Sequence, residues 1–83
     1  MRIRYFAWVR ERVGRAEEEL DLPASVNTVS DLMRWLAARD EGYAAAFAMP
    51  DVIRAALDHM HVQHDAHLAG SSELAFFPPM TGG

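Results

Sequence analysis

The C-terminal stretch "ELAFFPPMTGG", residues 73–83, ends in groups whose chemistry is unusual for the end of a folded domain. Gly82 and Gly83 have no Cβ, so they can pass through a channel too narrow for other residues and leave the terminal carbonyl open to attack. A carboxylate is a poor electrophile, and it reacts as one only after activation by an external group such as an adenylate. The residue types therefore predict that the Gly83 carboxylate is the substrate of an activating enzyme.

The residues before the two glycines are suited to carry that carboxylate away from the body of the domain. Pro78 and Pro79 fix φ and favour an extended chain, and the segment 78–83 reaches about 20 Å at roughly 3.3 Å per residue. Ordering a backbone residue costs about 1–2 kcal/mol, so the stiff prolines lower the cost of inserting the segment elsewhere. We predict that residues 78–83 form an extended flexible tail, with Thr81 and Gly82 threading into a partner's active site.

Composition restricts the classes of function that this chain can serve. Its 83 residues fit a single domain, residues 1–83, and the net charge of −4 with no basic stripe argues against nucleic-acid binding and favours a partner with a basic surface. No apolar run approaches the roughly 20 residues of a membrane span, and no signal peptide is visible, so we expect a cytoplasmic protein without membrane contact. The chain contains no cysteine and no lysine, which excludes a thiolate nucleophile and an acceptor amine for isopeptide bonds.

Four histidines, His59, His61, His64 and His67, fall within nine residues. His59 and His61 would place two imidazoles on one strand face, but a zinc site usually needs further convergent ligands such as cysteine or a carboxylate. We therefore predict no metal site and four exposed loop histidines. Exposed imidazoles would make a partner interface sensitive to pH.

The aromatic residues near the tail are expected to divide between the core and the surface. Successive strand residues point to opposite faces, so one of Phe76 and Phe77 must be exposed. By position we assign the exposed ring to Phe77, where it would serve as a docking anchor, since aromatic residues dominate interface hot spots. Trp35, on the main helix, is assigned to the core.

The pattern along the chain predicts a mixed sheet around one main helix. Thr28 with Asp31 three residues later indicates a helix start, and Gly42 is expected to end that helix. Glu17, Glu18 and Glu19 are expected to form a solvated strand edge. The predicted strands are residues 2–6, 17–22, 53–57, 60–63 and 73–77, and the predicted helices are residues 7–13 with a Gly14 cap, 28–42 with an apolar stripe at Val29, Leu32, Met33 and Leu36, and 43–49. This order of elements is an α+β arrangement, the outline of a β-grasp domain.

Three segments, "FAWVRERVG", "TVSDLMRWL" and the terminal "FFPPMTGG", together resemble the MoaD family, the small subunits of molybdopterin synthase, over essentially the whole chain. The resemblance implies a ubiquitin-like β-grasp sulfur carrier. It implies that a MoeB-like activating enzyme uses ATP to adenylate Gly83 and that a sulfur donor system then converts the terminus to a thiocarboxylate. No permanently bound cofactor is implied, because ATP serves only the transient acyl-adenylate.

The same resemblance implies a MoaE-like large subunit as the main partner, in a heterotetrameric synthase. The tail would deliver sulfur to a cyclic pterin precursor and build the dithiolene of molybdopterin, without a catalytic acid or base from the carrier. We place the partner-binding surface at Phe77, Pro78, Pro79, Phe6, Arg10 and His61. One departure affects this surface, because "LDHMHV" at residues 57–62 stands where the family commonly has an Asn-Gln pair followed by apolar residues.

Three other functions remain open from the sequence. A sulfur carrier for thiamine, cysteine or tRNA thiolation would share the β-grasp body and the terminal glycines, although the double proline favours the molybdopterin branch. A ubiquitin-like modifier that forms isopeptide bonds with other proteins would share the activation step. An interaction module with an inert tail is the third.

Overall fold

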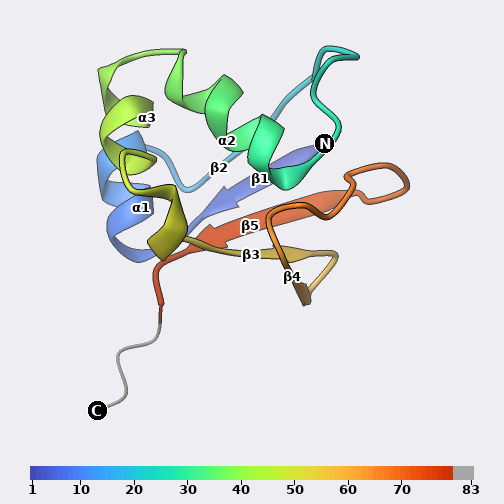
Figure 1. Cartoon of the computed structure of the whole chain (residues 1–83). Coiled ribbons are helices and arrows are strands. Elements are labelled where there is room, and N and C mark those ends of the chain that lie inside the picture. Colours follow the sequence, from blue (N-terminus) through green and yellow to red (C-terminus); the bar gives the residue numbers. More distant parts are fainter. Residues whose placement is uncertain (80–83) are drawn as a thin grey trace.

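The computed structural model describes residues 1–79, which form one five-stranded sheet with helices over one of its faces (Figure 1). The strand order is β2-β1-β5-β3-β4. No helix within these residues is long and apolar enough to cross a bilayer. The elements are β1 (Arg2–Tyr5), α1 (Ala7–Val13), β2 (Glu17–Glu19), α2 (Val29–Ala37), α3 (Glu41–Ala46), the 3₁₀ turn η1 (Pro50–Val52), β3 (Arg54–Leu57), β4 (Met60–Val62) and β5 (Glu73–Phe77).

The first and last strands form the centre of the sheet. β1 and β5 run parallel with Ile3 opposite Leu74 and Tyr5 opposite Phe76, while β2, β3 and β4 add antiparallel pairs on either side. These four side chains are almost fully buried beneath the helices. The predicted β-grasp fold, a mixed sheet around one main helix, is therefore confirmed.

The main helix, α2, begins where the sequence predicts. The Asp31 backbone N–H donates to Thr28 Oγ1 at 3.1 Å, and the Thr28 backbone N–H donates to Asp31 Oδ2 at 3.1 Å, which completes a capping box. The predicted apolar stripe of α2 faces the core. Trp35 lies beside the stripe instead of on it, so it is half-buried with the Arg39 guanidinium 5.4 Å from its ring, and its assignment to the core was wrong.

The prediction that Gly42 ends this helix was also wrong. The helix ends at Ala37, and Gly42 lies inside α3, a separate helix whose N-cap is Asp40. A Cβ at Gly42 would come within 2.8 Å of the Arg12 carbonyl oxygen at the end of α1. The glycine is required because α1 and α3 approach closely at this point, a contact that is invisible in the local sequence.

Glu18 is not part of a solvated strand edge. Its side chain is only 8% exposed and accepts hydrogen bonds from the hydroxyls of Tyr5 and Tyr43 and from the guanidinium of Arg39. Burial acts to raise the pKa of Glu18, but the hydrogen bonds from Tyr43, Tyr5 and Arg39 outweigh it and hold that pKa below its ordinary value. Burial and the neighbouring carboxylate raise the pKa of the Tyr5 hydroxyl. This network joins β1, β2 and α3.

Candidate functional site

The tail leaves the domain at one end of the sheet, beside α1 and the η1 turn (Figure 1). β5 ends at Phe77, and the half-buried Pro78 and Pro79 follow it. The predicted tail covers residues 78–83, of which residues 80–83 lie outside the described part of the chain. The roles assigned to Thr81, Gly82 and Gly83 therefore stay predictions.

The two phenylalanines at the end of β5 point to opposite faces of the sheet. Phe76 is fully buried, with its ring centroid 5.0 Å from that of Phe47 in an edge-to-face contact. Phe77 lies on the face without helices, as expected, but it is half-buried instead of fully exposed. The reason is His61 of β4, whose ring packs edge-on against Phe77 with a centroid distance of 5.3 Å.

A strained turn follows β1 at Phe6, whose backbone lies beside the end of β5. Phe6 donates its backbone N–H to the Phe76 carbonyl oxygen at 3.0 Å, and Ala7 then takes a φ of 52° that turns the chain sharply into α1. Left-handed backbone is uncommon for alanine and costs energy. The Phe6 side chain is 38% exposed, and the exposed Arg10 follows one helical turn later.

The structure thus brings the predicted partner-binding residues to one end of the domain. We call the set formed by Phe6, Arg10, His61 and residues 77–79 the tail-root surface. Beside it, Ala56 of β3 and Ala75 of β5 are paired across the strands on the face without helices. Both side chains are small; Ala56 is buried and Ala75 is half-buried.

The predicted pairing of two imidazoles on one strand face was wrong. His59 lies in the β3–β4 turn, not on a strand, with Asp58 and His59 at φ 46° and 71°. Two consecutive positive φ values are typical of a two-residue hairpin turn, which favours Asn-Gly or Asp-Gly. Asp58 fits because its Oδ1 accepts the backbone N–H groups of Ser72 and Glu73, each at 3.0 Å.

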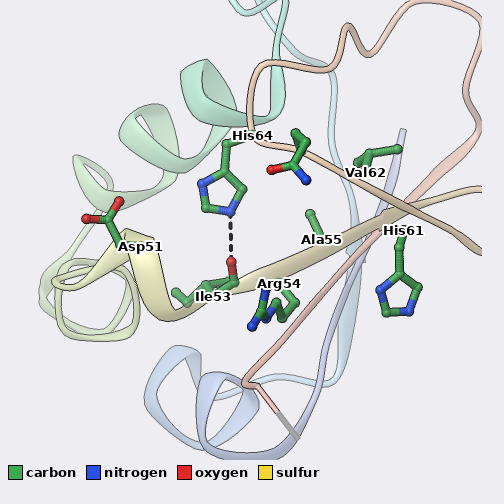
Figure 2. Close-up of a pocket in the computed structure, with 8 residues that line it drawn as sticks. Asp51, Ile53, Arg54, Ala55, His61, Val62 and His64 are labelled. Atoms are coloured by element: carbon green, nitrogen blue, oxygen red, sulfur yellow. Dashed lines mark hydrogen bonds between the residues drawn. The ribbon is translucent and has the colours of Figure 1, made fainter.

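His64 is not an exposed loop histidine either. It is half-buried, and its Nε2 lies 2.7 Å from the Ile53 carbonyl oxygen, a hydrogen bond that closes the loop after β4 onto β3 (Figure 2). His67 is exposed, as expected. Within residues 1–79, no group of three or more histidines and carboxylates is arranged to hold a metal ion. The described residues therefore form a surface around the end of β5, and the reactive carboxylate predicted at Gly83 lies outside the described part of the chain.

Comparison with known proteins finds similarity over essentially the whole chain. Residues 3–83 match the ThiS family. The molybdopterin synthase sulfur carrier subunit of Escherichia coli (strain K12) is 35% identical over 83 residues, which cover 100% of this chain and 99% of that protein.

Two solved structures share the fold. SAMP1 of Haloferax volcanii superposes with a TM-score of 0.72 at 25% identity, covering 100% of this chain and 98% of that one. A Pyrococcus furiosus protein, titled as subunit 1 of a molybdopterin converting factor, gives a TM-score of 0.73 at 26% identity, with 95% of each chain covered.

Proposed function

The chain belongs to the ThiS family, and we propose that it is the sulfur-carrier subunit of a molybdopterin synthase, with the sulfur carried on Gly83. The observation that carries the proposal is the full-length match to the E. coli sulfur carrier subunit, which includes the C-terminal residues. The geometry supports the proposal, because the central strand β5 is followed directly by two prolines that belong to the tail-root surface.

The proposed chemistry has two stages. In the first, a MoeB-like activating enzyme binds ATP and adenylates the Gly83 carboxylate, and a sulfur donor system replaces the adenylate to give a thiocarboxylate. In the second, the thiocarboxylate sulfur attacks a cyclic pterin precursor to give a thioester, and hydrolysis of that thioester leaves the sulfur on the precursor and returns the Gly83 carboxylate. A second charged carrier supplies the other sulfur of the dithiolene. The carrier contributes reach and positioning, so holding the terminus near the reacting atom is its main catalytic contribution.

The tail-root surface is the proposed contact with the MoaE-like large subunit, with which the carrier would form a heterotetramer in the cytoplasm. The rings of Phe6 and Phe77 provide apolar anchors, and Pro78 and Pro79 set the direction in which the tail enters the partner. The small side chains of Ala56 and Ala75 on the adjoining sheet face would let the partner approach the strands closely.

Intact-mass measurement tests the proposal directly. Incubation with the activating enzyme, ATP and a sulfur source should replace one oxygen of the chain with sulfur, and fragmentation should place the change on Gly83. Deletion of Gly83 should abolish the change while the domain still folds. The proposal is wrong if the deleted chain supports full molybdopterin formation. Stable conjugates to lysines of other proteins would instead support a protein modifier.

Gly82→Val separates delivery from activation. A branched Cβ at this position should block passage through a narrow channel, so sulfur transfer to the pterin precursor should stop although the terminal carboxylate remains. Gly70→Val is a matched control, because Gly70 lies in the loop before β5, at the other end of that strand from the tail, with a φ of 85°, and its substitution should affect stability alone. Equal sulfur transfer by Gly82→Val and the unmodified chain would contradict the threading role.

A further inference from the structure

A polar hollow adjoins the tail-root surface on its β3–β4 side. Its volume is about 430 Å³, and two of its lining residues contact the Phe77 region directly. Arg54 is the cross-strand partner of Phe77, and His61 packs on the Phe77 ring. The hollow is lined by Asp51, Ile53, Arg54, Ala55, His61, Val62, Gln63 and His64.

In the part of the chain that the structure describes, the arginines at this end of the domain have no carboxylate partner, whereas most of the other arginines have one. Five of the eight arginines form ion pairs with carboxylates, and Arg12 stacks on Trp8 at 4.3 Å. Within residues 1–79, the two remaining arginines, Arg10 and Arg54, have no carboxylate within 4.0 Å. Both are exposed. Arg54 pairs across the strands with Phe77, the last residue of β5, and Arg10 belongs to α1, which lies at that end of the sheet (Figure 1).

The one carboxylate that lines the hollow does not neutralise Arg54. Figure 2 shows Arg54 and His61 on one side of the β3 ribbon and His64 on the other, with Asp51 at the far end, in the η1 turn. His64 is already engaged with the Ile53 carbonyl oxygen. Among the described residues, the part of the hollow nearest Phe77 therefore presents a guanidinium and an imidazole without a counter-charge.

We propose that this part of the hollow receives an acidic side chain of the large subunit when the tail is inserted, an inference that rests on the proposed function. A planar guanidinium matches a carboxylate in a bidentate geometry, and the imidazole of His61 can donate a second hydrogen bond beside it. The contact is continuous with the tail-root surface. The net charge of −4 led us to expect a partner with a basic surface. At this point of contact the proposal requires an acidic group on the partner instead.

Titration calorimetry of the carrier against the large subunit of the same organism tests this proposal. Arg54→Gln should weaken binding at least about fivefold at low salt, and the difference should shrink below about twofold near 0.5 M salt, because salt screens an ion pair at a partly exposed site. Arg54→Glu should weaken binding more strongly. Arg2→Gln is the matched control, since Arg2 lies on the same sheet face at the opposite end and is paired with Glu17 at 3.5 Å.

Each outcome is decisive. If the unmodified carrier does not bind the large subunit, the proposed function fails and this inference fails with it. If it binds and Arg54→Gln behaves like Arg2→Gln, the function stands and the acidic contact is refuted. Tighter binding by Arg54→Glu shows a basic partner surface and also refutes it. Finally, Arg54→Gln should still weaken binding when the Gly83 carboxylate is converted to a carboxamide; loss of the effect would mean that Arg54 acts on the carrier's own tail.

Discussion

Alanine substitution at the adjacent Phe76 and Phe77 should produce opposite consequences. Phe76 is fully buried against Phe47 and Tyr5. Removing a buried phenylalanine ring costs about 3–5 kcal/mol, whereas a domain of this size has a total stability of about 4–12 kcal/mol. Phe76→Ala should therefore lower the melting temperature by at least about 12 °C, at roughly 4–8 °C per kcal/mol.

Phe77→Ala should leave the fold nearly intact and act on binding. The ring is half-buried against one neighbour, His61, so its loss should cost only about 1 kcal/mol of stability. As a central aromatic anchor, it should contribute at least about 1 kcal/mol to binding of the large subunit, roughly a fivefold change in Kd.

Thermal melts followed by circular dichroism measure the stability of each variant, and calorimetric titration measures the affinity per folded molecule. The reasoning is refuted if Phe77→Ala unfolds the domain as readily as Phe76→Ala. It is also refuted if Phe77→Ala binds the large subunit as tightly as the unmodified chain does.

Four further outcomes follow from the fold. Glu18→Gln should lower the free energy of unfolding at pH 7 by about 2 kcal/mol in urea titrations, because charge-assisted hydrogen bonds are lost. Folding lowers the pKa of Glu18, so the stability that this carboxylate contributes is present above its ordinary pKa of 4.5 and is lost as pH falls through the lowered pKa. The stability of the variant should therefore fall less steeply with decreasing pH in the acid range. Gly42→Ala should lower the melting temperature by several degrees, because its Cβ would clash with the Arg12 carbonyl oxygen, and an unchanged value would contradict that contact. His59→Gly should raise the melting temperature, because glycine accepts the φ of 71° without strain and the contact of the exposed His59 ring with Glu73 contributes little, and an unchanged or lower value would contradict the strain at this position. Zinc at modest excess should leave the melting temperature unchanged in differential scanning fluorimetry, and a clear rise would show a site that binds the folded state.

The sequence by itself determined the features that depend on neighbours a few residues apart. The alternation in residues 73–77 placed Phe76 and Phe77 on opposite faces, because the side-chain period of a strand is two. The Thr28–Asp31 pair marked the start of α2, since both capping hydrogen bonds span three residues. The tail motif predicted a reactive terminus, because that prediction depends on the chemistry of the two glycines and the terminal carboxylate and not on the fold.

Tertiary structure alone decided the features that join distant parts of the chain. Glu18 accepts from Tyr43, which lies 25 residues away, and Gly42 meets the Arg12 carbonyl oxygen on another helix. The strict alternation of β2 could have indicated that Glu18 points inward, but no local signal names its partners. Arg54 reads as an ordinary exposed arginine until β3 pairs with β5 and sets it beside Phe77. Charge pairing and close packing depend on distances in space, and only the folded chain fixes those distances.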